Sequence, residues 1–107
     1  MTGPEDRHPP RRQQQEQQQQ WQDQVPAGPG GAMTDEVGVI TGPLTLRTTA
    51  VAGGLVRFDV QYTDADEWYT LTGSPLPHHG DPAALHAAAL GAIRAGHAAE
   101  APRSGAV

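Results

Sequence analysis

The chain has 107 residues, no cysteine and a formal net charge of −5 at pH 7. This length suits one small domain, and the lack of cysteine excludes disulfide bonds and thiolate metal sites as sources of stability. The acidic balance argues against a nucleic-acid binder, which neutralises phosphates with a basic patch. No apolar run approaches the roughly 18 residues of a membrane span, so we expect no membrane partner and a cytoplasmic location.

The first third of the chain is rich in glutamine, proline and glycine and has little to bury. Nine glutamines lie within residues 13–24, and only three large apolar residues precede Met33. Such a segment cannot bury enough apolar surface to offset the entropy lost on ordering. Residues 1–36 are therefore predicted to form a disordered arm.

Two interpretations of this arm stay open. It is either an interaction tail, as glutamine-rich segments often are, or a segment upstream of the true start at Met33. The second interpretation rests on Gly30-Gly31-Ala32, because tandem glycine codons can spell a ribosome-binding site just before the methionine. In both cases, the folded domain is predicted at residues 37–97 and a frayed tail at 98–107.

Three segments alternate between apolar and polar residues with a period of two, which indicates half-buried strands. They are residues 44–48, 56–62 and 67–72. Residues 37–40 are a candidate for a short extra strand, ended by glycine and proline.

The register of the first hairpin is predicted from the number of residues in its loop, because an odd or even number decides which side chains share a face. A three-residue loop at 52–54 pairs Leu46 with Val60, and the same register pairs Thr48 with Phe58. The apolar faces then agree, and glycine supplies the left-handed position that such loops need. A slip of one residue would turn every side chain to the other face.

The second hairpin is predicted to turn through a four-residue loop at 64–67. This loop sets Leu71 near Val60, keeps Tyr69 on the core face and sends Trp68 to the opposite, open face. A three-residue loop would reverse these faces and bury Trp68. We favour the longer loop because it buries two apolar side chains and exposes one.

The last predicted element is a helix that begins at Asp81-Pro82 and ends near Gly96. Aspartate is a good N-cap, proline suits the first helical position, and glycine suits the C-terminal cap. Its apolar stripe consists of Leu85, Ala89 and Ile93, with Leu90 at its margin. The predicted fold is α+β: a three-stranded antiparallel meander with one C-terminal helix packed on one face.

Four histidines fall late in the chain, and three of them are candidates for a metal site together with Asp81. His78, His79, Asp81 and His86 could approach one another near the start of the helix. Their spacing fits no zinc pattern. His97 lies roughly 16 Å from His86 along the helix, so both cannot bind one ion. We therefore expect neither a metal nor a cofactor.

Catalytic signals are equally sparse. The carboxylates Asp64, Asp66 and Glu67 fall on a tight hairpin, where turn residues are normally solvated. The two serines, Ser74 and Ser104, lack the context of a nucleophile elbow. A small sheet with one helix also leaves little volume for a ligand cleft. The chain is therefore predicted not to be an enzyme.

The open face of the sheet is the predicted interaction surface. Trp68, Arg57 and Asp59 should lie together there, and an exposed tryptophan beside an arginine is typical of interface anchors. The alternative is that Trp68 is covered by residues 37–40 or by a second subunit. The sheet edges carry little protection, so we expect pairing with a second copy or with another protein.

One stretch of the chain is similar to part of the antitoxins of some bacterial toxin–antitoxin pairs, which have small β-β-β-α modules. The residues that carry this similarity are Gly73, Gly80-Asp81, Ala84-Leu85 and Ala92-Ile93. The resemblance implies a regulator that binds a partner protein. The main prediction is a small, non-catalytic, homodimeric interaction module. The alternatives are an antitoxin-like regulator and a small enzyme or metal-binding protein that uses the histidine cluster.

Overall fold

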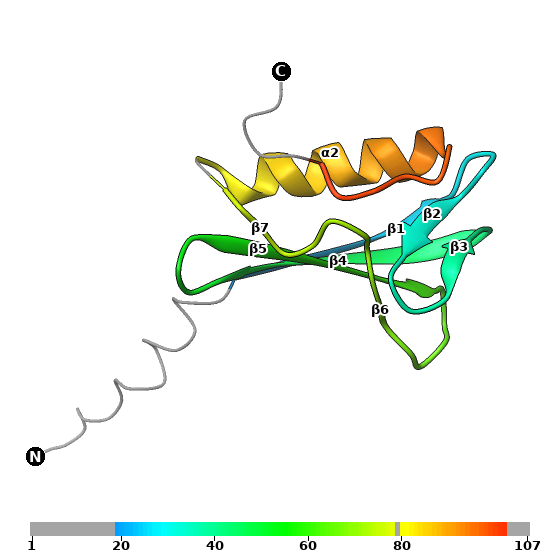
Figure 1. Cartoon of the computed structure of the whole chain (residues 1–107), viewed down its shortest axis with the longest axis horizontal. Coiled ribbons are helices and arrows are strands. Elements are labelled where there is room, and N and C mark those ends of the chain that lie inside the picture. Colours follow the sequence, from blue (N-terminus) through cyan, green and yellow to red (C-terminus); the bar gives the residue numbers. More distant parts are fainter. Residues whose placement is uncertain (1–18, 79, 103–107) are drawn as a thin grey trace, which may run out of the picture.

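The computed structural model describes residues 19–78 and 80–102 of the chain (Figure 1). Its elements, in chain order, are β1 (Gln19–Pro26), β2 (Ala32–Thr34), β3 (Gly38–Ile40), β4 (Pro43–Val51), β5 (Leu55–Tyr62), β6 (Tyr69–Thr70), β7 (Leu76–Pro77) and α2 (Pro82–Ala95). The predicted α+β class with antiparallel strands is confirmed. None of the helices in the described residues is long and apolar enough to cross a membrane.

The main sheet has five strands in the order β1-β4-β5-β6, and β7 pairs with the other end of β5. The predicted register of the β4–β5 hairpin is confirmed, with Leu46 opposite Val60 and Thr48 opposite Phe58. The prediction of a three-stranded meander is wrong, because β1 extends the sheet beyond β4. α2 lies over one face of this sheet, as predicted, and contacts β1 and β4 (Figure 1).

The prediction that residues 1–36 form a disordered arm is wrong for residues 19–36. β1 pairs with β4 from Gln19 opposite Ala50 to Pro26 opposite Pro43. Glutamines fill its solvent-facing positions, while the alternate positions face α2 and bury Val25 completely. A polar strand can form here because β4 supplies hydrogen-bonding partners for its backbone. Residues 1–18 of the predicted arm lie outside the described residues.

Residues on both sides of Met33 belong to the fold. β2 and β3 form a second, two-stranded sheet in which Met33 lies opposite Val39 and Ala32 opposite Ile40. Ala32 and Ile40 are buried in the core. The candidate strand at residues 37–40 is thus present as β3, but it pairs with β2.

The second hairpin differs from its predicted register by two residues. Tyr69, rather than Leu71, lies opposite Val60. The chain makes a tight turn after β5, where Ala65 N–H donates to the Tyr62 carbonyl and Asp64 takes a left-handed φ of 72°. The tight turn shortens the connection between the paired residues by two, an even number, so the predicted faces are kept and Leu71 is buried.

The limits of the helix are those expected from its capping residues. The Asp81 carboxylate accepts a hydrogen bond from Ala83 N–H, and Gly96 N–H donates to the Ala92 carbonyl at the C-terminal end. The core under α2 consists mainly of apolar side chains from the sheet and the helix. It comprises Val25, Ala32, Ile40, Leu44, Leu46, Val56, Phe58, Val60, Leu71, Leu76, Ala89, Ile93 and Ala99.

The segment after β1 holds the C-terminal end of α2 by backbone hydrogen bonds. Gly28 N–H donates to the Ile93 carbonyl, and the N–H groups of residues 97–99 donate to the carbonyls of residues 29–31. The predicted frayed tail is therefore wrong for residues 98–102, where Ala99 is buried. Residues 103–107 of that tail lie outside the described residues.

Hydrogen bonds from side chains join the β2–β3 turn to β6. The Glu36 carboxylate accepts from the N–H and the hydroxyl of Thr70, each at 2.7 Å. These hydrogen bonds favour the ionised form and lower the pKa of Glu36 below its ordinary value. These hydrogen bonds therefore stabilise the fold fully at pH values above the ordinary pKa of glutamate. The stabilisation is lost as the pH falls through the lowered pKa of Glu36 in the folded protein.

Candidate functional site

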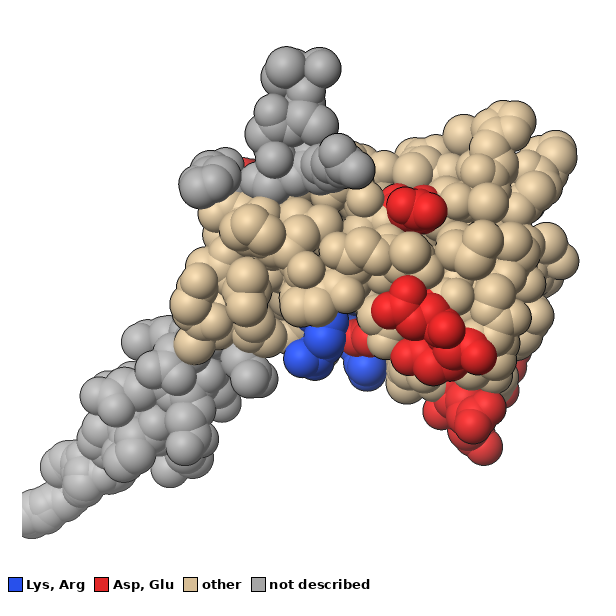
Figure 2. Space-filling view, viewed as in Figure 1, with Lys and Arg blue, Asp and Glu red and all other residues tan. Residues whose placement is uncertain are grey.

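The face of the sheet that points away from α2 carries a continuous polar surface. Alternation along the paired strands places eleven side chains on this open face: Gln20, Gln22, Gln24, Thr45, Arg47, Thr49, Arg57, Asp59, Gln61, Trp68 and Thr70. Figure 2 shows arginine side chains on the side of the molecule away from the helix, next to acidic side chains.

A cluster of four side chains, the Trp68 cluster, occupies the centre of this face. The Arg47 guanidinium stacks on Trp68, with Cζ 4.0 Å from the ring centroid. The Asp59 Oδ2 atom accepts from Arg47 Nη2 and from Arg57 Nε, each at 3.4 Å. Asp59 is buried, so the two guanidinium groups and the indole form an ordered platform around one carboxylate.

The structure therefore brings together the three interaction residues expected from the sequence, Trp68, Arg57 and Asp59. The arginine that stacks on the indole is Arg47, not Arg57. The sequence does contain a signal for Arg47. In the predicted register of the first hairpin, it lies directly opposite Asp59.

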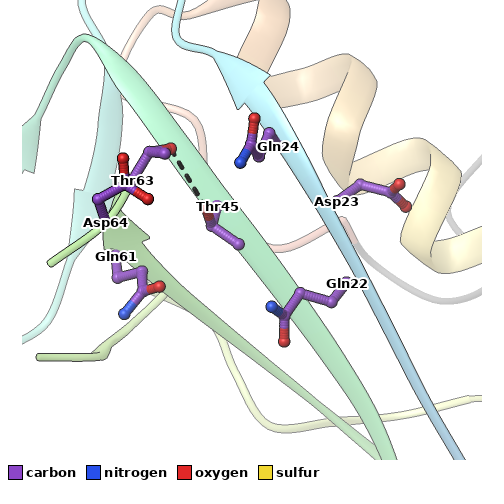
Figure 3. Close-up of a pocket in the computed structure, with 7 residues that line it drawn as sticks. All are labelled: Gln22, Asp23, Gln24, Thr45, Gln61, Thr63 and Asp64. Carbon is purple, nitrogen blue, oxygen red and sulfur yellow. Dashed lines mark hydrogen bonds between the residues drawn. The ribbon is translucent and has the colours of Figure 1, made fainter. Parts of the chain in front are cut away.

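Beside this cluster the open face is hollowed into a depression of about 480 Å³ (Figure 3). Its lining consists of Gln22, Asp23, Gln24, Thr45, Gln61, Thr63 and Asp64. The lining is mostly neutral amide and hydroxyl groups, and the Thr45 and Thr63 hydroxyls are hydrogen-bonded at 3.2 Å. Asp23 projects the other way, toward the helix. These groups can donate to and accept from a polar partner surface.

On the covered face, a hydroxyl, an imidazole and a carboxylate form a chain between three elements. Thr48 Oγ1 of β4 lies 2.6 Å from His86 Nδ1 of α2, and His86 Nε2 lies 2.8 Å from Asp23 Oδ2 of β1. An ionised carboxylate only accepts, so Nε2 carries a proton and donates to Asp23. In the neutral imidazole, Nδ1 then accepts from the Thr48 hydroxyl.

Thr48, His86 and Asp23 are the residue types of an acyl-transfer triad, but the placement of these three side chains does not suit that chemistry. The Thr48 side chain is fully buried under α2, so no substrate carbonyl can approach its hydroxyl. The His86 side chain is 6% exposed, whereas the Asp23 side chain is 59% exposed. The arrangement instead satisfies the polar atoms of a buried histidine and ties the helix to both strands.

We expect His86→Ala to destabilise the protein by about 3 kcal/mol, because it leaves a cavity and removes the partner of the buried Thr48 hydroxyl. Urea denaturation followed by circular dichroism measures the change. His97→Asn is the matched control, because His97 is exposed with a φ of 64° that asparagine tolerates. Equal urea midpoints for the two variants would contradict the structural role of His86.

The other residues considered for a metal site have separate surroundings. Asp81 caps the helix, and His78 has a buried Nδ1 atom without a hydrogen-bond partner among the described residues. His79 lies outside the described residues. Within residues 19–78 and 80–102, no three histidine, aspartate or glutamate side chains gather closely enough to hold a metal ion.

Comparisons with protein-family models, with curated proteins and with solved structures found no match for this chain.

Proposed function

We propose that this chain is a small, non-catalytic protein-interaction module of the cytoplasm that works as a homodimer. The observation that supports this best is the Trp68 cluster on the sheet face opposite α2 (Figure 1). Tryptophan and arginine are enriched among residues that dominate binding energy at protein interfaces.

The Trp68 cluster is suited to binding because its side chains are already held in place. Asp59 fixes both guanidinium groups, and Arg47 in turn supports the indole. A partner that covers this platform therefore immobilises few additional rotamers, which reduces the entropic cost of association. The polar depression beside the cluster adds donors and acceptors for a polar rim.

Site-specific photocrosslinking in the cells that make the protein tests this proposal. A photoreactive amino acid in place of Gln61 reports on the open face, and the same residue in place of the exposed Ala88 reports on the far side of α2. We expect protein adducts from position 61, identified by mass spectrometry, and a loss of at least tenfold in their yield with Trp68→Ala.

Position 88 is the control, because it lies on the helix and away from the Trp68 cluster. Equal adduct patterns from positions 61 and 88, or adducts at position 61 that Trp68→Ala leaves unchanged, would contradict the open face as the binding surface. Circular dichroism of the Trp68→Ala protein checks that the variant is folded.

A further inference from the structure

β1 is an edge strand, and its hydrogen-bonding groups point alternately toward β4 and away from it. Ala27 N–H donates to the Gly42 carbonyl, in register with the pairing of β1 and β4. The odd-numbered residues of β1 therefore bond to β4. The N–H and carbonyl groups of Gln20, Gln22 and Gln24 point outward, and no strand in the described residues pairs with them.

This edge lacks most of the features that protect edge strands from pairing. Its outward positions carry no lysine and no charged side chain, and β1 is eight residues long. The protective residue is Pro26, the last residue of β1, which has no N–H to donate. Any strand that pairs with this edge is therefore confined to the residues before Pro26.

We propose that two copies of the chain join through their β1 strands, antiparallel and centred on Gln22. This inference rests on the homodimer of the proposed function and names the surface that forms it. Gln22 then lies opposite Gln22 of the second copy, and Gln20 lies opposite its Gln24. The two sheets become one, with the glutamine amides of both copies in a ladder across the open face.

The register follows from charge and from Pro26. Centring on Gln22 overlaps residues 19–25 and sets Asp23 opposite Trp21 of the second copy. The neighbouring register, which overlaps residues 20–26, would set Asp23 opposite Asp23 of the second copy, where the like charges repel. It would also set Pro26 opposite Gln20 of the second copy. Shifts in either direction beyond these shorten the overlap of the described strand to five residues.

A single cysteine reports this register directly, because the chain contains no other cysteine. Residues directly opposite each other in a hydrogen-bonded antiparallel pair have Cα atoms about 5.5 Å apart, which a disulfide can span. We expect Gln22→Cys to form a disulfide-linked dimer on mild oxidation. Gln20→Cys and Gln24→Cys should not link to themselves but should link to each other when mixed.

A second pair of variants tests the backbone hydrogen bonds without relying on cysteine. Gln22→Pro removes an N–H that points to solvent in the single chain, so the fold is kept while the dimer loses hydrogen bonds at its centre. We expect light scattering to show at least tenfold weaker dimerisation for Gln22→Pro than for Gln22→Ala, which loses the side-chain amide but keeps the backbone N–H. Circular dichroism should show that both variants are folded, like the unmodified chain.

The outcomes separate this inference from the proposed function. A dimer that Gln22→Pro does not weaken, or one that is linked through Asp23→Cys or Trp21→Cys instead of Gln22→Cys, overturns the proposed edge or register and leaves the homodimer standing. A monomer at high concentration overturns both the β1 dimer and the homodimeric part of the proposed function. Photocrosslinking at position 61 remains an independent test of the open face.

Discussion

A chain that starts at Met33 is expected to show no cooperative unfolding transition. The deletion removes all of β1, which pairs with β4 over eight residue positions and buries Val25 against the core. It also removes residues 28–31, whose backbone holds the end of α2. A domain this small has a total stability of about 5–15 kcal/mol, and the loss of a whole strand from its core approaches that amount.

The matched control is a chain that starts at Gln19 and so retains β1 and every other described element. Urea denaturation followed by circular dichroism compares the two chains, and their difference reports on residues 19–32. Similar cooperative transitions with similar midpoints would show that β1 is dispensable. The assignment of β1 to the folded domain would then be wrong.

The sequence could predict the first hairpin and the helix because local chemistry specifies both. In the hairpin, both strands alternate strongly, so only one parity of the loop brings Leu46 and Val60 to the same face. In the helix, Asp81 and Gly96 satisfy backbone groups at the two ends, and this effect does not depend on the rest of the fold. The structure confirms both elements.

β1 could not be predicted in the same way, because its stability comes from its neighbours. Glutamine has no strong preference for strands, and Val25 is its only fully buried residue. The strand forms because β4 would otherwise present unpaired backbone groups and because α2 covers one side of it. Composition alone therefore favours disorder, whereas the tertiary pairing favours a strand.

The candidate site was partly predictable for the same physical reason. Parity placed Trp68, Arg57 and Asp59 on one face, and the observed shift of the second hairpin keeps this assignment because two is an even number of residues. The stacking of Arg47 on Trp68 depends on the length of the second loop, because the observed register moves Trp68 two residues closer to Asp59 and to its cross-strand partner Arg47. The Thr48–His86–Asp23 chain could not be foreseen at all without β1.

Gly28→Ala is expected to lower the stability of the protein by more than about 3 kcal/mol. A Cβ atom at this position would lie within 2.7 Å of the Ala95 carbonyl carbon and oxygen, and closer still to the Arg94 carbonyl oxygen. These are backbone atoms at the end of α2, which cannot rotate away as a side chain can. The loop after β1 and the helix end would have to separate.

Gly91→Ala is the matched control for this substitution, because it makes the same chemical change inside α2. A Cβ at Gly91 meets no heavy atom within 4 Å, and alanine is the better helix former by about 1 kcal/mol. Urea denaturation should therefore move the two midpoints in opposite directions. A Gly28→Ala midpoint equal to that of the unmodified chain would contradict the close contact between this loop and the helix.

Gly28 tests this contact more cleanly than Gly96, which approaches the same loop from the helix side. A Cβ at Gly96 would meet the backbone of residues 28–29, but Gly96 also has a φ of 86°, which alanine rarely adopts. Destabilisation by Gly96→Ala would therefore mix a steric clash with backbone strain. Gly28 lies outside the left-handed region, so the effect of Gly28→Ala measures the close approach alone. A large effect there would establish that residues upstream of Met33 are packed against the helix and are part of the folded protein.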